Sequence, residues 1–342
     1  MSENPLSVVV EKTRTQAALG SLRAEGVYDD GRSIYECGDE TVAIPVSEPP
    51  QETAVLEVIE EAGERRLRSL EDHLREAGWS EEEIDTAPGS WAVIGSVILV
   101  EASDSPRPTE LGEALLAMHG SADTVLSREG ISGRHREPEF TVIAGEGDTE
   151  TVHQEHGTTY ALDLSEVMFS PGNKAERARM GDIVGVDERV LDMFAGIGYF
   201  TLPMARSGAH VTAVEHNPAS FAYLVENVVR NGVEEQVETY RADCRDVVSG
   251  GKSKGDGFEF DRVVMGYYDA FEYLDSAMAA VAPGGTIHMH EATPEPLAYD
   301  RPVERLREAA KAAGREAEIL DTRTVKGYSE GVSHVVVDAK IV

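Results

Sequence analysis

The stretch of residues 189–203 restricts the fold of this chain more than any other, because a short apolar run leads directly into a glycine-rich turn. It reads Arg-Val-Leu-Asp-Met-Phe-Ala-Gly-Ile-Gly-Tyr-Phe-Thr-Leu-Pro. We expect its first residues to end a buried strand and a helix to begin near Phe200. Gly196 and Gly198 lack a Cβ atom, so a ligand can lie against the main chain close to a helix N-terminus. The stretch therefore predicts a strand, a turn and a helix that together bind a ligand.

The chain beyond this turn repeats the alternation of strand and helix, and acidic residues follow several of the strands. We expect a helix at 218–231 and strands at 210–215, 237–242, 260–265 and 285–290. Glu215 closes the first of these strands, 19 residues after Gly196. An acid at that position suits the two hydroxyl groups of a ribose in a Rossmann-type crevice. Repeated βα units predict an α/β fold with a parallel, doubly wound sheet.

The residues around the glycine turn distinguish between two kinds of nucleotide-binding protein. A dehydrogenase that binds a dinucleotide prefers Gly or Ala where this chain has Thr201, and it does not need Asp192 before the turn. The pattern Asp-x-Phe-x-Gly-x-Gly instead resembles motif I of the class I S-adenosylmethionine-dependent transferases. This resemblance implies a Rossmann-like catalytic domain with S-adenosylmethionine as co-substrate. Nicotinamide binding and a purely structural turn are the alternatives.

The charge of the chain indicates the surroundings in which it works. Its 63 acidic residues against 31 basic ones give a net charge of −32 at pH 7, and the acids are spread over the whole length. We interpret this as a surface adapted to concentrated salt, as in a halophilic archaeon, because salt screens the self-repulsion. Such a charge normally disfavours nucleic acid, but in molar salt the release of counterions contributes little for any protein. An RNA partner is therefore compatible with it.

Cysteine content and hydropathy restrict the location. Cys37 and Cys244 are far apart and lack the spacing of a metal site. No apolar run approaches the length of a membrane span. We expect a cytoplasmic protein with no metal and no membrane association.

Three segments are expected along the chain: a small α+β module at 1–48, an α+β domain facing RNA at 49–158, and the catalytic domain at 159–342. The second segment has an expected strand at 90–100 and a glycine-rich loop that carries Arg128, Arg134 and Arg136. Basic residues clustered in so acidic a chain are candidate RNA contacts, although a solvated loop explains them equally well.

A more specific resemblance begins ahead of the glycine turn. The run Phe-Ser-Pro-Gly-Asn at 169–173 is followed by Glu-Arg at 176–177 and then by the glycine turn. This order resembles an archaeal and eukaryotic tRNA-modifying family with two branches. One branch methylates N1 of the guanine 3′ to the anticodon. The other is the wybutosine-pathway tRNA 4-demethylwyosine α-amino-α-carboxypropyltransferase, which acts on the tricyclic base built from that methylguanine.

Further motifs favour the second branch. They are Asp-Arg-Val-Val-Met-Gly-Tyr at 261–267, Ile-His-Met-His-Glu at 287–291, Arg-Pro-Val-Glu-Arg-Leu at 301–306 and Gly-Val-Ser-His-Val-Val-Val-Asp-Ala-Lys at 331–340. The methyltransferases usually carry Asn-Leu-Pro or a similar motif where this chain has Gly-Tyr-Tyr at 266–268. The resemblance thus implies transfer of the 3-amino-3-carboxypropyl group to 4-demethylwyosine in tRNA-Phe, with release of 5′-methylthioadenosine.

Two alternatives stay open at this point. Residues 1–48 look like the leading domain of the methyltransferase branch. Guanine-N1 methylation at the same anticodon-loop position is therefore the first alternative. The second is a non-catalytic RNA-binding protein built on a decayed transferase fold.

The resemblance also implies a cofactor site, made of Ser170, Arg177, Asp192, Gly196, Gly198, Glu215, Asp243 and Cys244. Arg177 would clamp the methionine carboxylate, Glu215 would accept from both ribose hydroxyls, and Asp243 would accept from the adenine amino group. A surface position for Arg177 and a helix N-cap role for Asp243 are the competing explanations.

Tyr267 and His290 are expected on the substrate side of the site. His288 and His290 have a spacing that could bind a metal, but no third ligand lies nearby in the sequence, so core or base-stacking roles are preferred. The expected partner is the anticodon stem-loop of tRNA-Phe, bound by a monomer. The sequence identifies no catalytic base.

Overall fold

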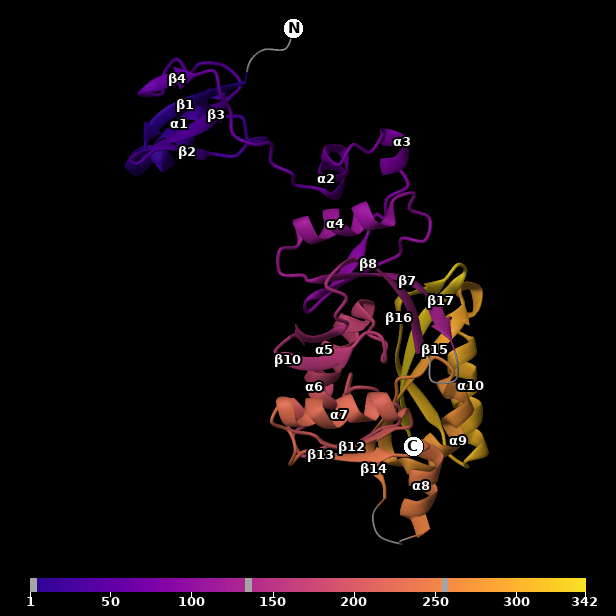
Figure 1. The fold of residues 1–342 in the computed structure, drawn as a ribbon. Helices are drawn as coiled ribbons and strands as arrows, with labels where there is room; N and C mark the ends of the chain where they lie inside the picture. Colours follow the sequence, from indigo (N-terminus) through magenta and orange to yellow (C-terminus); the bar gives the residue numbers. More distant parts are fainter. Residues whose placement is uncertain (1–4, 133–136, 254–257) are drawn as a thin grey trace. The chain divides into compact units, whose positions relative to one another are not determined.

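The computed structural model describes residues 5–132, 137–253 and 258–342 (Figure 1). The chain forms two compact units. One comprises residues 1–86 and 113–119, and the other comprises 87–112 and 120–342. The predicted domain boundaries near 48 and 158 stay predictions. No helix of the described ranges is both long enough and apolar enough to cross a membrane.

The first unit contains a four-stranded sheet in the order β2-β3-β1-β4. Its elements are β1 (Leu6–Glu11), α1 (Thr15–Glu25), β2 (Tyr35–Gly38), β3 (Thr41–Val46) and β4 (Glu57–Ile59). Val8, Leu22 and Ile44 are fully buried between α1 and the sheet. Two short helices follow, α2 (Leu70–Glu76) and α3 (Glu81–Ile84), and each begins with a serine capping box. The unit is small and α+β, as expected for the leading module, but β4, α2 and α3 lie beyond the predicted end at residue 48.

A second four-stranded sheet belongs to the larger unit and has the order β5-β6-β7-β8. Its strands are β5 (Trp91–Ile94), β6 (Val97–Val100), β7 (Thr124–Ser132) and β8 (Glu137–Gly145), and α4 (Pro108–Met118) lies between β6 and β7 in the sequence. The predicted single strand at 90–100 is wrong. Gly95 adopts a left-handed φ of 57°, so the chain reverses there and β5 pairs antiparallel with β6.

A separate hairpin, β9 (Glu150–Glu155) and β10 (Thr158–Asp163), precedes the catalytic sheet. Its free edge is paired by the side-chain amides of Asn227 and Asn231, which bond Ala161 and Thr159, rather than by a strand. The amide of Asn227, which is fully buried, accepts from the N–H of Ala161 at 2.6 Å and donates to its carbonyl oxygen at 3.0 Å. The same amide donates to the carbonyl oxygen of Ile197, in the glycine turn, at 3.0 Å. Asn227 therefore joins the hairpin to the turn.

The catalytic sheet has seven strands in the order β13-β12-β11-β14-β15-β17-β16. Five are parallel, as predicted: β11 (Arg189–Asp192), β12 (His210–Glu215), β13 (Val237–Arg241), β14 (Phe260–Met265) and β15 (Val281–Pro294). The chain runs outward from β11 to β13 and then returns to place β14 on the other side of β11. That reversal creates a switch point, and ligands of open α/β sheets bind at the carboxyl ends of the strands there.

Two strands of this sheet differ from the prediction. β16 (Ala317–Ser329) and β17 (Val332–Ile341) pair antiparallel with each other, and β17 pairs antiparallel with β15. The sheet is therefore mixed: its five predicted strands are parallel, and the two antiparallel strands were not predicted. β15 also extends beyond the predicted range 285–290, because β17 pairs with it through residue 294.

Helices cover both faces of the catalytic sheet (Figure 1). Val190 and Leu191 alternate along β11, and each is buried in a different core, as the pleat requires. The core around Val190 includes side chains from α5 (Lys174–Ile183), α6 (Thr201–Arg206) and α7 (Pro218–Arg230). The core around Leu191 includes side chains from α8 (Cys244–Ser253), α9 (Leu274–Ala280) and α10 (Arg301–Ala312). This is the doubly wound arrangement.

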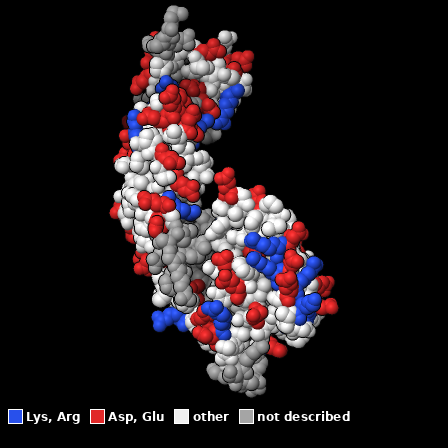
Figure 2. Space-filling model, turned by 90° about the vertical axis from the view of Figure 1, so that its right-hand side faces the viewer, with Lys and Arg blue, Asp and Glu red and all other residues white. Residues whose placement is uncertain are grey.

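Acidic side chains are spread over the face of the molecule seen in Figure 2, with a few clusters of Lys and Arg between them. The distribution matches the sequence, in which the excess of acids runs through the whole chain.

Candidate active site

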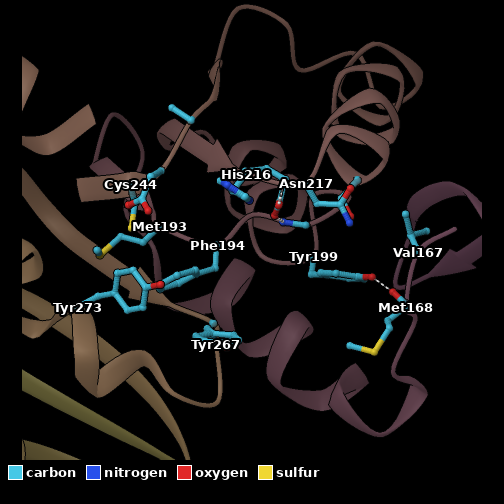
Figure 3. Close-up of a pocket in the computed structure, with 16 residues that line it drawn as sticks. Val167, Met168, Met193, Phe194, Tyr199, His216, Asn217, Cys244, Tyr267 and Tyr273 are labelled. Carbon is cyan, nitrogen blue, oxygen red and sulfur yellow. Dashed lines mark hydrogen bonds between the residues drawn. The ribbon is translucent and has the colours of Figure 1, made fainter. Parts of the chain in front are cut away.

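A cavity lies at the carboxyl ends of β11, β12, β13 and β14 (Figure 3). These strands include β11 and β14, between which the order of the sheet reverses. Its wall comes from the residues that directly follow these strands. They include Met193 and Phe194 after β11, Glu215, His216 and Asn217 at the end of β12, Ala242, Asp243 and Cys244 after β13, and Gly266 and Tyr267 after β14. We call this the cofactor cavity.

The two glycines of the turn have different positions relative to this cavity. Both have left-handed φ values, 58° at Gly196 and 102° at Gly198. Gly196 lines the cavity, and a Cβ atom there would overlap the ring of Tyr199, while the predicted close approach of a ligand stays a prediction. A Cβ atom at Gly198 would lie 2.7 Å from Leu202 of α6, so this glycine lets the turn pack against its own helix.

Glu215 is held in the cavity wall by the main chain. One carboxylate oxygen accepts from the N–H of Gly196 at 2.8 Å, and the other accepts from the N–H of Asn217 at 2.6 Å. Burial nevertheless raises the pKa of this carboxyl group above its usual range. Each oxygen keeps a further lone pair, so the fixed carboxylate can accept from a pair of hydroxyl groups.

Asp192 lies behind the cavity rather than in its wall. Its side chain is fully buried and accepts from the hydroxyl of Thr201 at 2.8 Å and from the N–H of Phe194 at 3.4 Å. Burial raises the pKa of Asp192 to about 6. The Asp and Thr that distinguish this turn in the sequence thus hold each other and fix the start of α6.

The far end of the cavity combines a fixed acid with aromatic rings. Arg245 donates to both carboxylate oxygens of Asp243, at 2.9 and 2.6 Å, and this contact lowers the pKa of Asp243. Figure 3 shows Phe194, Tyr267 and Tyr273 gathered on one side of the cavity, and the ring centroid of Phe194 lies 5.3 Å from that of Tyr267 and 4.9 Å from that of Tyr273. These flat apolar walls suit a planar heterocycle.

Cys244 follows Asp243 in the cavity wall. The side chain is buried, and burial raises the pKa of its thiol to about 12. The thiol is therefore neutral and acts as a small apolar group.

A second cavity adjoins the first and shares Met168, Phe194, Tyr199, Gly266 and Tyr267 with it. We call it the inner cavity. Its other lining residues are Ser170, Asn173, Arg177, Phe200, Tyr268, His290 and His334. Two of the predicted cofactor residues, Ser170 and Arg177, thus line the inner cavity and do not line the cofactor cavity.

Arg177 is 3% exposed and already paired within the chain. Its guanidinium donates to both carboxylate oxygens of Glu155, at 2.8 and 2.9 Å, and to the carbonyl oxygen of Ser170 at 3.0 Å. The Ser170 hydroxyl accepts from Lys326 of β16. The predicted clamp on the methionine carboxylate stays a prediction, and a ligand would meet only those N–H groups that Glu155 and Ser170 leave free.

The predicted RNA-side residues occupy different places. Tyr267 lines both cavities, and His290 is buried in the wall of the inner cavity. Arg128 lines a third cavity, together with Tyr268 and Lys326. Arg134 and Arg136 lie outside the described residues, so their role stays a prediction.

Several wall residues were not predicted from the sequence. Asn217 had a recognisable signal, since an Asn directly before Pro218 is typical of a helix N-cap, and its side chain accepts from the N–H of Ala219 at 2.9 Å. Tyr199, which lines both cavities, had no local signal, and neither had Glu155, which lies behind the wall and pairs with Arg177. Over the described ranges, no group of three or more His, Cys, Asp or Glu side chains is placed to hold a metal ion.

The fold and the cofactor cavity define a class I S-adenosylmethionine-dependent transferase, and comparison with known proteins identifies its family. Residues 151–320 match the TRM5/TYW2 methyltransferase domain, and residues 70–149 match the TYW2 N-terminal domain. The chain is 37% identical over 265 residues to the tRNA(Phe) (4-demethylwyosine(37)-C(7)) aminocarboxypropyltransferase of Pyrococcus horikoshii, which covers 76% of this chain and 92% of that protein. The chain therefore belongs to the TRM5/TYW2 family.

Solved structures support this assignment and confirm the predicted fold class. The crystal structure of P. horikoshii TYW2 in complex with MeSAdo superposes with a TM-score of 0.65 at 34% identity, covering 78% of this chain and 96% of that one. The crystal structure of Trm5b from Pyrococcus abyssi has a TM-score of 0.74 at 29% identity and covers 98% of this chain and 99% of that one.

Proposed function

We propose that this protein transfers the 3-amino-3-carboxypropyl group of S-adenosylmethionine to the tricyclic 4-demethylwyosine base next to the anticodon of tRNA-Phe, releasing 5′-methylthioadenosine. The observation that carries the proposal is the wall between the two cavities. It includes Gly266 and Tyr267. The family resemblance implies a side-chain amide at this position in the guanine-N1 methyltransferases. The similarity to the P. horikoshii aminocarboxypropyltransferase supports the same choice.

The proposed transfer depends on how the base and S-adenosylmethionine are positioned more than on further reactive groups of the protein. The sulfonium of the co-substrate has three electrophilic carbons: the methyl carbon, C5′ of the ribose and Cγ of the aminocarboxypropyl arm. A carbon of the base forms a bond to Cγ, the Cγ–S bond electrons pass to sulfur, and the base loses one proton. The neutral thioether leaves without help from a metal. The reacting carbon is selected by which one lies in line with the base, at about 3–3.5 Å.

The residues proposed to hold the co-substrate divide between the two cavities. Glu215 accepts from the ribose hydroxyls and Asp243 from the adenine amino group, with Gly196 and Cys244 against the ligand. Asp192 and Gly198 act indirectly by shaping the turn. The methionine arm extends towards the inner cavity, where Ser170 and Arg177 lie. An arm in that direction places Cγ, rather than the methyl group, towards the base.

The proposed macromolecular partner is the anticodon stem-loop of tRNA-Phe, bound by a monomer. Arg128 and Lys326 in the third cavity are candidate phosphate contacts. Acting on tRNA fits a cytoplasmic location, and the net charge of −32 fits concentrated salt. We infer that RNA recognition here relies on shape and base contacts more than on net attraction, because salt screens long-range charge.

Guanine-N1 methylation is the second candidate, and one observation favours it. The Trm5b structure covers 98% of this chain, including the small N-terminal sheet, whereas the TYW2 structure covers 78%. The leading module thus has its counterpart in a protein named as a methyltransferase of the same family.

The released thioether decides between the two. The protein is incubated in concentrated salt with S-adenosylmethionine and tRNA-Phe that carries 4-demethylwyosine, and the products are separated by liquid chromatography. Release of 5′-methylthioadenosine with a heavier tricyclic nucleoside is the expected result. Release of S-adenosylhomocysteine, with N1-methylguanine formed in unmodified tRNA, would replace the proposal by the second candidate.

A further inference from the structure

Two histidines on neighbouring strands of the catalytic sheet form a hydrogen-bonded pair in the wall of the inner cavity. His290 is on β15 and lies opposite Val336, while His334 of β17 lies opposite Ala292. The two are therefore diagonal neighbours on one face of the sheet, where aromatic side chains are within reach of each other. Nδ1 of His290 and Nε2 of His334 are 2.9 Å apart, so one of them donates and the other accepts.

The remaining nitrogen of each ring has no hydrogen-bond partner among the described residues. These outer nitrogens are Nε2 of His290 and Nδ1 of His334, in side chains that are 2% and 1% exposed. His288, two residues earlier on the same face, differs. Its Nδ1 bonds Asp338 at 2.6 Å and its Nε2 bonds Arg262, so both of its nitrogens are used by the fold. Buried polar atoms are rarely left unpaired, so an unpaired nitrogen in a side chain that lines a cavity is a candidate partner for a ligand.

The hydrogen bond between the two rings determines which outer nitrogen is a donor and which is an acceptor. We call it the inner hydrogen bond. A neutral imidazole carries one N–H. If Nδ1 of His290 donates, its Nε2 is an acceptor and His334 must carry its proton on Nδ1, as a donor. If Nε2 of His334 donates instead, the two outer roles are exchanged. In either state the pair presents one donor and one acceptor, and both rings have the same tautomer.

The protonation of the two rings supports this arrangement. Burial, with the nearby charge of Arg323, lowers the pKa of His290 to about 3. Burial, with His290 and Lys326 as further causes, lowers the pKa of His334 to about 2. Both rings are therefore neutral, and only neutral rings can present one outer donor and one outer acceptor.

The surroundings match a flat, polar-edged ligand. The ring centroid of Phe200 lies 5.2 Å from that of His290, and the ring of Tyr268 meets His334 edge-on at 4.8 Å. Tyr267 and Gly266 are among the five residues that line both this cavity and the cofactor cavity. A planar heterocycle between these rings would reach the pair with its edge and the co-substrate with its reacting side.

We propose that His290 and His334 form the hydrogen-bonding face of the subsite for the acceptor base, giving one hydrogen bond to its edge and taking one from it. This inference rests on the proposed function for the identity of the base, a fused-ring derivative of guanine. The pair acts as a positioning device: a base that offers both an N–H and a bare nitrogen or oxygen on one edge satisfies both outer nitrogens, and the order of these two groups along the edge selects the tautomer of the pair. A base that lacks either group leaves one buried nitrogen unpaired, which weakens its binding.

Variants that remove only the outer nitrogens test the proposal. His290→Asn keeps an amide near the position of Nδ1, and His334→Gln keeps one near Nε2, so each can preserve the inner hydrogen bond. Binding is measured for tRNA-Phe with 4-demethylwyosine and with unmodified guanine, in the presence of 5′-methylthioadenosine. We expect each variant to lose about 10-fold or more of its affinity for the preferred tRNA. The affinity for S-adenosylmethionine should stay within about twofold of the wild type.

His288→Asn is the matched control, since it removes a buried histidine of the same strand whose nitrogens serve the fold. It should lower the melting temperature without changing the ratio of the two tRNA affinities. The proposal would be overturned if both His290→Asn and His334→Gln kept the wild-type ratio of the two tRNA affinities. It would also be overturned if either variant lost as much affinity for S-adenosylmethionine as for tRNA. If the wild type binds tRNA with unmodified guanine more tightly than tRNA with 4-demethylwyosine, the proposed function fails. The role of the histidine pair is then still judged by whether the variants change the ratio of these two affinities.

Nitrogen-15 spectra of the wild-type histidines give a test that needs no variant. Addition of an anticodon stem-loop with the tricyclic base should shift His290 and His334 together into one shared tautomer. Spectra that stay unchanged on saturation with this RNA would contradict the proposal.

Discussion

Glu215 and Gly196 are joined by a hydrogen bond of 2.8 Å from the Gly196 N–H to the carboxylate, which ties the end of β12 to the turn after β11. Both residues line the cofactor cavity. The acid at the end of β12 and the glycine turn are therefore one unit, because a change in the carboxylate alters the main chain that lines the cavity.

Glu215→Gln should weaken S-adenosylmethionine binding by about 1–3 kcal/mol. Glu215 accepts from two backbone N–H groups, and a glutamine has only one oxygen, so its NH2 group would face the N–H of either Gly196 or Asn217. Calorimetry in concentrated salt measures the affinity. Glu226→Gln, on the surface of α7 and paired with Arg230, is the control and should bind like the wild type. Equal affinities for both variants would show that Glu215 does not contact the ligand.

Asp192→Asn should change how stability depends on pH. The pKa of Asp192 is raised from 3.8 to about 6, so between these values the folded chain keeps a proton that the unfolded chain has lost. Wild-type stability from this group is present below pH 4 and is lost as the pH rises to about 6, by up to about 3 kcal/mol. Asparagine does not titrate. The stability of the variant relative to the wild type should therefore rise between pH 4 and pH 7 in urea titrations, and parallel curves would contradict the raised pKa.

Glu155→Gln should destabilise the fold by about 3 kcal/mol or more, since it leaves the guanidinium of Arg177 buried without its counter-charge. Denaturant unfolding measures the loss. Replacing both partners, Glu155→Leu with Arg177→Met, should recover much of it, because no buried charge is then left. If the double variant is stable but has lost cofactor affinity, Arg177 contacts the ligand as well as Glu155.

The two cysteines should differ sharply in reactivity. Cys37 is exposed, whereas Cys244 is buried with a thiol pKa raised to about 12. A disulfide reagent at pH 8 should label one thiol in the native protein and two after unfolding, since only the thiolate reacts. Cys37→Ser should reduce native labelling to almost none. Rapid labelling of that variant would mean that Cys244 is accessible in solution.

The sequence predicted the parts of the site that depend on local order. Strand, glycine turn and helix follow one another directly, so Gly196, Glu215 and Asp243 could be placed at strand ends, and the structure puts all three in one cavity. Antiparallel β16 and β17 were missed because their pairing joins strands outside the repeating βα pattern. The hairpin at Gly95 was missed because both of its strands are apolar and read as one.

Partners from distant segments could not be predicted from spacing alone. Arg177 looked available for a ligand, but its carboxylate partner, Glu155, belongs to a hairpin that the sequence pattern did not indicate. His288 and His290 looked equivalent, since they alternate on one strand. Only the fold brings Asp338 to His288 and His334 to His290, which gives the two rings different roles.

The amide of Asn227 has a consequence for how ligand binding spreads through the protein. It holds both the edge of β10, at Ala161, and the carbonyl oxygen of Ile197 in the glycine turn. A motion that lifts the β9–β10 hairpin must therefore break the hydrogen bonds between Ala161 and the amide that also holds the glycine turn. By thermodynamic linkage, a cofactor that stabilises the turn in this conformation should also oppose this opening. The amide hydrogen of Ala161 should accordingly exchange with solvent more slowly once the cofactor cavity is filled, although Ala161 is not among the residues that line that cavity.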